Sequence, residues 1–197
     1  MKKLAPFIFV LTLFCSLWHS AMLEAEAASL SEKVLRLHVR ASDDTPAAQG
    51  RKLLVRDVLV RSLDPILAGC GDREAAAEKT RAALPELRRA AETALDRLGE
   101  GERVSLSLQW EEFPERSYPG VTLPAGEYLA LRADLGEGSG KNWWCVVWPP
   151  LCLAASEEEG EEALDVFSPQ EQRILTASGV QLRLRLLDWL RRVFGQR

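Results

Sequence analysis

Two stretches in which apolar and polar residues alternate, separated by a long helical region, constrain the fold of this chain most. In residues 34–41 (VLRLHVRA), apolar side chains alternate with Arg36, His38 and Arg40. In residues 103–112 (RVSLSLQWEE), apolar residues again recur at every second position. Successive side chains of a strand point to opposite faces, so each pattern predicts a strand with one buried face.

The region between these strands predicts helices. A capping side chain, Asp44 or Thr45, precedes Pro46, and this order is typical of a helix start. We expect this helix to continue to about Ala68, where a Gly-Cys-Gly sequence ends it.

A second helix is expected after Asp72, which is a good N-cap residue. Proline lacks the backbone N–H and clashes with the preceding turn of a helix. Pro85 therefore predicts a kink or short break and the start of a third helix over residues 85–98.

Two further strands are expected after a proline-rich loop. Residues 127–135 (EYLALRADL) and 143–148 (WWCVVW) are joined by a glycine-rich turn, and the second is apolar on both faces. The order of one strand, helices and three strands favours an α+β fold. We expect a two-layer sandwich: a mainly antiparallel sheet of about four strands with helices on one face, plus a C-terminal amphipathic helix.

The N-terminus predicts export. Lys2 and Lys3 precede an apolar run from Leu4 to Trp18, which is shorter than the roughly 20 residues that span a bilayer. Ala25 and Ala27 supply the small residues of a cleavage site. The segment is therefore interpreted as a signal peptide cleaved after Ala27, and an uncleaved anchor is the alternative.

The predicted organisation has four parts. Residues 1–27 form the signal peptide, 28–155 the α+β domain, 156–168 an acidic linker and 169–197 a helical tail. Residues 180–194 of the tail have one apolar and one basic face. Such a helix either contacts an anionic membrane surface peripherally or docks on its own domain.

Composition argues against several function classes. The formal net charge is −4, which does not suit a nucleic-acid-binding protein. Only two histidines are present, so neither a metal site nor a cofactor is expected. A thiol enzyme would need Cys145 near His38, but a cysteine within an apolar run has a poorly reactive thiol.

Residues 142–152 (NWWCVVWPPLC) do not fit a purely structural strand. They hold three of the six tryptophans, more indole than one small core easily buries. We therefore predict a surface that binds a partner protein, and the alternative is a single hydrophobic core strand. On a regular strand Trp144 and Trp148 share one face and Trp143 points to the other. The predicted partner-binding residues are Asn142, Trp143, Trp144, Trp148, Pro149 and Pro150.

The cysteines leave two alternatives open. Cys145 and Cys152 flank a double proline, and in an exported protein they either form a disulfide or pack as reduced core residues. Cys70 then remains as an unpaired cysteine.

Four blocks of the sequence resemble a known family. They are residues 35–43 (LRLHVRASD), 52–57 (KLLVRD), 124–128 (PAGEY) and 138–152 (GSGKNWWCVVWPPLC). In this order they resemble the stage II sporulation protein R family of endospore-forming bacteria, and the last block is the most specific. Ala41 departs from the family pattern, which commonly has Ala-Asn there.

The resemblance implies a role that composition does not show. Members are secreted from the forespore into the space between the forespore and mother-cell membranes. There they activate a membrane-embedded aspartic protease, stage II sporulation protein GA, which leads to processing of pro-sigma factor E in the mother cell. The chain would then be a signalling protein and not an enzyme. The alternatives are a secreted cell-wall hydrolase or thiol enzyme, and a structural envelope protein.

Overall fold

The computed structural model describes residues 11–18, 29–99, 101–118, 121–151 and 168–176. Its elements are β1 (Leu35–Arg40), α2 (Pro46–Leu67), α3 (Arg73–Asp96), β2 (Val104–Phe113), β3 (Arg116–Tyr118), β4 (Val121–Leu123), β5 (Gly126–Leu135), β6 (Asn142–Trp148) and α5 (Pro169–Thr176).

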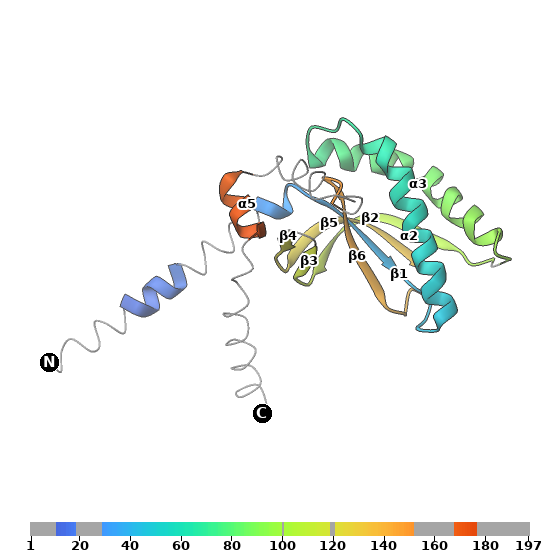
Figure 1. Ribbon diagram of the computed structural model, residues 1–197, viewed down its shortest axis with the longest axis horizontal. Coiled ribbons are helices and arrows are strands. Elements are labelled where there is room, and N and C mark those ends of the chain that lie inside the picture. The colour runs from blue at the N-terminus through green and yellow to red at the C-terminus, as the bar shows by residue number, and fades with distance from the viewer. Residues whose placement is uncertain (1–10, 19–28, 100, 119–120, 152–167, 177–197) are drawn as a thin grey trace, which may run out of the picture.

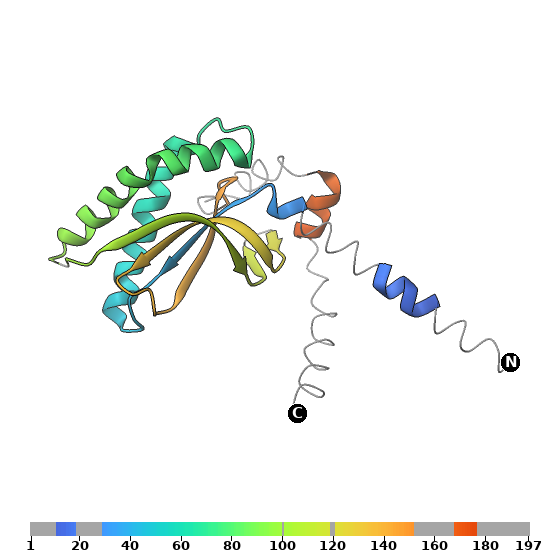
Figure 2. The same cartoon turned by 180° about the vertical axis from the view of Figure 1, so that it is seen from behind.

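Four strands form one sheet in the order β2-β5-β1-β6. Strand β1 lies between β5, to which it is parallel, and β6, to which it is antiparallel, while β2 and β5 pair antiparallel. Helices α2 and α3 form a second layer on one face of this sheet (Figure 1; Figure 2). The α+β fold with a mainly antiparallel sheet is therefore confirmed.

The helix starts follow the capping signals, but the break predicted at Pro85 is wrong. Thr45 accepts a hydrogen bond from the Ala48 amide, and Asp72 accepts one from the Ala75 amide. Helix α3 continues through Pro85 as one element. Apolar residues before and after this proline pack into the same core, and this packing offsets the lost backbone hydrogen bond.

The helix-side core lies between α2, α3 and the sheet. The odd-numbered residues of β1 and β5 and the even-numbered residues of β2 point into it. A register shift between Leu35 and Arg36 pairs Leu35 with Trp148 and brings Trp148 into this core. The prediction that Trp144 and Trp148 share a face is therefore wrong, because a bulge changes the alternation.

A second, smaller core covers one end of the opposite face. Phe113, Tyr128 and Val146 of the sheet contact apolar residues from outside it, including Leu123 of β4 and Leu175 of α5. Strands β3 and β4 form a separate two-stranded sheet within the segment predicted as a loop. The remaining cover comes from Leu30, Val34 and Leu151, with Tyr118 and Trp144 partly buried at its margin.

Three predicted segments fall largely outside the described residues. Most of the predicted signal peptide, nearly all of the acidic linker and residues 177–197 of the tail lie there. Residues 11–18 form a short helix with exposed apolar side chains. Within the described part of the chain, no helix is both long and apolar enough to cross a membrane.

Candidate partner-binding site

The start of β6 is fixed by a tight contact with the end of β1. A Cβ atom on Gly140 would lie 2.2 Å from the backbone oxygen of Asp43, so only glycine fits without a backbone shift. The Gly140 amide donates to the Ala41 carbonyl at 2.8 Å. The Lys141 amide donates to Asp44 Oδ1 at 2.7 Å. These contacts set where Asn142, the first residue of β6, begins.

Helix α2 holds the same turn from the other side. Lys52 Nζ donates to the Lys141 carbonyl at 3.1 Å, and burial lowers the pKa of Lys52. One helical turn later, the Arg56 guanidinium lies 4.3 Å from the ring centroid of Trp143. Trp143 remains 36% exposed. An exposed indole at a sheet edge is thus held in place by a cation–π contact.

On the opposite face, His38 joins two of the predicted residues. Its ring stacks on Trp144 with centroids 3.8 Å apart. His38 Nε2 lies 2.9 Å from Asn142 Oδ1, and Nδ1 lies 2.7 Å from Glu111 Oε2. The imidazole therefore fixes the rotamers of Asn142 and Trp144.

A charge network continues from Glu111 across the sheet. Arg132 donates to Glu111 at 3.0 Å and to Asp134 at 2.8 Å, and Arg40 also pairs with Asp134. Two arginines and two carboxylates balance each other in this ladder. Such a paired, half-buried network orients side chains and carries no excess charge for a ligand.

The six predicted partner-binding residues differ in how much of their surface is exposed to solvent. Asn142 and Trp143 are exposed and Trp144 is half-buried, while Trp148 is 5% exposed and belongs to the helix-side core. Pro149, which follows a cis peptide bond, is buried, and Pro150 is exposed. Only the first half of β6 therefore presents aromatic surface.

The cysteines do not support a thiol enzyme built on Cys145 and His38. Cys145 is disulfide-bonded and faces the helices, whereas His38 points to the other face of the sheet. The predicted disulfide partner of Cys145 is Cys152, which lies outside the described residues. The pairing of these two cysteines therefore stays a prediction. Cys70 is a free, half-buried cysteine. No cluster of metal-ligating side chains occurs among the residues that the structure describes.

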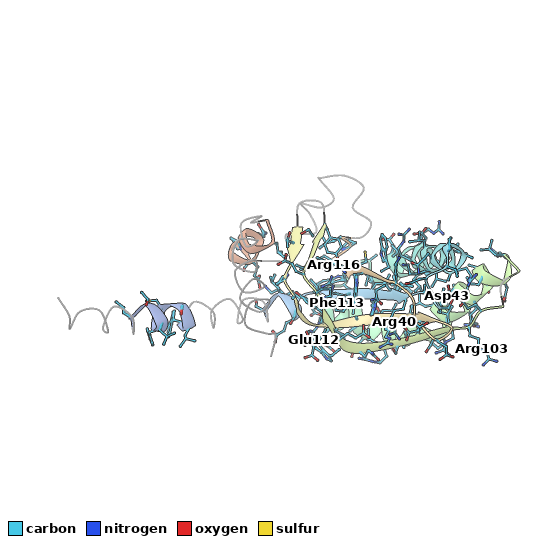
Figure 3. The ribbon with its side chains drawn as sticks, turned by 90° about the horizontal axis from the view of Figure 1, so that it is seen from below. Arg40, Asp43, Arg103, Glu112, Phe113 and Arg116 are labelled. Atoms are coloured by element: carbon cyan, nitrogen blue, oxygen red, sulfur yellow. The ribbon has the colours of Figure 1, made fainter. Side chains whose placement is uncertain are left out.

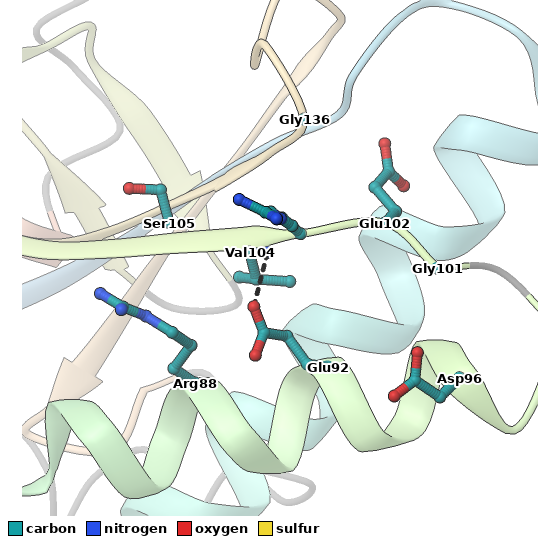
Figure 4. Close-up of a pocket in the computed structure, with 9 residues that line it drawn as sticks. Arg88, Glu92, Asp96, Gly101, Glu102, Val104, Ser105 and Gly136 are labelled. Atoms are coloured by element: carbon teal, nitrogen blue, oxygen red, sulfur yellow. Dashed lines mark hydrogen bonds between the residues drawn. The ribbon is translucent and has the colours of Figure 1, made fainter.

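An open groove between α3 and the start of β2 was not predicted (Figure 4). Arg88, Glu92 and Asp96 line it from one face of α3, a spacing of four residues that the sequence does show. Glu92 accepts a hydrogen bond from the Val104 amide, and Glu102 pairs with Arg51. Two of the carboxylates that line the groove, Glu92 and Glu102, are therefore already engaged within the chain.

Comparisons with known proteins agree with the four sequence blocks. Residues 31–158 match the family described as stage II sporulation protein R. A protein of Bacillus subtilis (strain 168) with that description is 27% identical over 193 residues, covering 87% of this chain and 86% of the relative. No solved structure matches the chain. Because the matched segment spans more than half of the sequence, the chain belongs to the stage II sporulation protein R family.

Proposed function

We propose that this chain is an exported signalling protein that activates a membrane-embedded aspartic protease, stage II sporulation protein GA, in the space between the forespore and mother-cell membranes. Activation then leads to processing of pro-sigma factor E. Family membership supports a role in sporulation. The positively charged, apolar N-terminus supports export.

The observation that carries the partner-binding part of this proposal is the free edge of β6. In the described chain no strand pairs with its outer side, and the exposed Trp143 and half-buried Trp144 lie on the two faces of this edge. Aromatic side chains with exposed surface dominate the energetics of protein interfaces. Asn142 adds an exposed polar group beside them.

Activation requires no catalytic group in this chain. A ligand shifts an equilibrium by its difference in affinity for two states. The β6 edge would bind the outward-facing part of the protease more tightly in its active, dimeric form and so increase the population of that form.

The test is coexpression of this chain, its cognate protease and pro-sigma factor E in a host that does not sporulate. We expect processing only when all three are present. Processing without this chain would contradict the proposed trigger. Hydrolysis of isolated cell wall by the purified chain alone would favour the hydrolase alternative instead.

A further inference from the structure

Arg36 occupies an unusual position for an arginine. It lies in the middle of the sheet on β1 and is 0% exposed. Its guanidinium carbon is 4.0 Å from the ring centroid of Phe113 and 4.8 Å from that of Tyr128. Burial lowers the pKa of Arg36 and raises the pKa of Tyr128 to about 12.

The polar atoms of Arg36 are mostly unused. Nη2 donates to the Tyr118 hydroxyl at 2.9 Å, while Nε and Nη1 have no hydrogen-bond partner among the described residues. No carboxylate among the described residues pairs with Arg36, and the neighbouring cation Arg116 adds positive charge. A buried charge is costly unless it is paired, and two ring contacts compensate only a part of that cost.

Arg36 is covered by the short β3–β4 hairpin, whose Leu123 packs into the second core. Tyr118 ends β3, and β3 and β4 are strands of three residues each that pair only with each other in the described chain. Two-stranded sheets of this size are marginally stable alone. Figure 3 shows Arg116 of β3 beside Phe113, at the end of the sheet away from Arg40 and Asp43. A ligand that displaced Tyr118 would therefore meet the Arg36 guanidinium.

We propose that Arg36 binds a carboxylate carried by an acidic side chain of the partner protein, which reaches it when the β3–β4 hairpin lifts. A carboxylate in place of the Tyr118 hydroxyl can accept from Nη2 and from one of the two unused nitrogens, the bidentate geometry that arginine favours. Its single negative charge balances the single buried cation. The site lies next to the β6 edge, since Tyr118 also donates to the Trp144 carbonyl at 3.5 Å. Only the source of the carboxylate rests on the proposed function.

The first test needs no partner. The melting temperature of the exported chain is measured while sodium acetate replaces sodium chloride at constant ionic strength, with inorganic phosphate in a parallel series. We expect acetate to raise the melting temperature by about 2–4 °C in the wild type and not in Arg36→Met. Equal responses of both proteins, or no response, overturn the proposal. A larger Arg36-dependent response to phosphate than to acetate overturns the carboxylate assignment.

Arg40→Met is the matched control, because Arg40 lies on the same face of β1 but pairs with Asp134. We expect it to keep the acetate response. Tyr118→Phe removes the hydroxyl that competes for Nη2 and should increase the response. Arg36→Met should melt no lower than the wild type, because methionine fills the space without an unpaired charge. If it fails to fold, Arg36 is a structural cation and the proposal is wrong.

The second test uses the coexpression system. Arg36→Met should reduce processing at least about 30-fold, the effect of removing one member of a buried charge pair at an interface. Normal processing by Arg36→Met overturns the partner contact and leaves the proposed function intact. The opposite outcome is that acetate stabilises the wild type through Arg36 but the wild type triggers no processing. That outcome contradicts the proposed function and leaves the carboxylate site at Arg36 intact.

Discussion

The two faces of the sheet are built by different means. The helix side is a continuous apolar core of leucine, valine and alanine with Trp148 at one end. The opposite side carries a network of arginines, carboxylates and a histidine, and beside it the smaller core around Phe113 and Tyr128. Side chains on the helix side are therefore held in place by apolar packing alone. On the opposite side, a charged residue is held in place where it is paired and is available to a partner where it is not.

This difference separates residues that hold the fold from residues that are available to a partner. On the helix side of the sheet, the exposed indoles Trp143 and Trp110 lie on the edge strands β6 and β2. On the other side, Arg40 and Arg132 are balanced by carboxylates, whereas Arg36 is not. Interaction surface is thus expected at the edges and at the unbalanced end of the second face.

The largest expected effect is on the helix side. Trp148→Ala should lower the free energy of unfolding by about 3–5 kcal/mol, because it removes a large, buried aromatic side chain and leaves a cavity. Urea unfolding of the exported chain measures it. A loss below about 1 kcal/mol would mean that Trp148 is not part of the core.

Loss of Arg40 should cost less. Arg40→Met should destabilise the chain by about 1–3 kcal/mol, because Asp134 keeps only Arg132 as a partner and all three groups are partly exposed. Arg36→Met is the comparison and should have no such cost. Similar losses of unfolding free energy in Arg40→Met and Arg36→Met would show that pairing with a carboxylate does not determine how much an arginine on this face contributes to stability.

The strand pattern and the helix caps were predictable because they depend on local alternation and on short-range hydrogen bonds. The four sheet strands were found within about two residues at each end. The buried face of β2 was also predicted correctly. The predicted break at Pro85 was wrong because tertiary packing of α3 outweighed a local preference.

The chemistry of the second face was less predictable. Arg36, His38 and Arg40 alternate with apolar residues, and such a pattern normally indicates a solvated face. The burial of Arg36 depends on the β3–β4 hairpin, which comes later in the chain and has a weak sequence signal. The bulge that turns Trp148 inward likewise depends on pairing with β1.

The cover provided by α5 makes a smaller, pH-dependent contribution. Burial alone would raise the pKa of Glu171, but hydrogen bonds from Lys33, Ser29 and Ser168 lower it to about 2. This stabilisation is present above the ordinary pKa of about 4.5 and is lost as the pH falls towards 2. We expect a loss of about 1–3 kcal/mol over this range, reduced by solvent screening of Lys33.

Glu171→Gln provides the control for this pH dependence, because glutamine keeps the shape of the side chain and does not titrate. Unfolding free energies of both proteins are compared at several pH values between the two limits. The difference between them should shrink as the pH falls. A constant difference would show that Glu171 has the same pKa in the folded and unfolded chain.

The smallest effect on stability is expected at the β6 edge, where the functional effect is large. Trp143→Ala should change the free energy of unfolding by less than about 1 kcal/mol, because the indole is 36% exposed and makes one cation–π contact with Arg56. Processing in the coexpression system should nevertheless fall about 30-fold, as for loss of an interface residue worth 2 kcal/mol.

Trp110 is the matched control for Trp143. It is 47% exposed on β2 at the other edge of the sheet, and Arg73 of α3 lies 5.1 Å from its ring centroid. Both indoles are thus exposed, lie on an edge strand of the sheet and contact an arginine. They differ in the residues that surround them. Of the two, Trp143 is next in sequence to Trp144, which stacks on His38 and whose carbonyl accepts a hydrogen bond from Tyr118 of the hairpin over Arg36. Trp110→Ala should therefore leave processing unchanged, and loss of processing in Trp110→Ala alone would place the partner at the β2 edge.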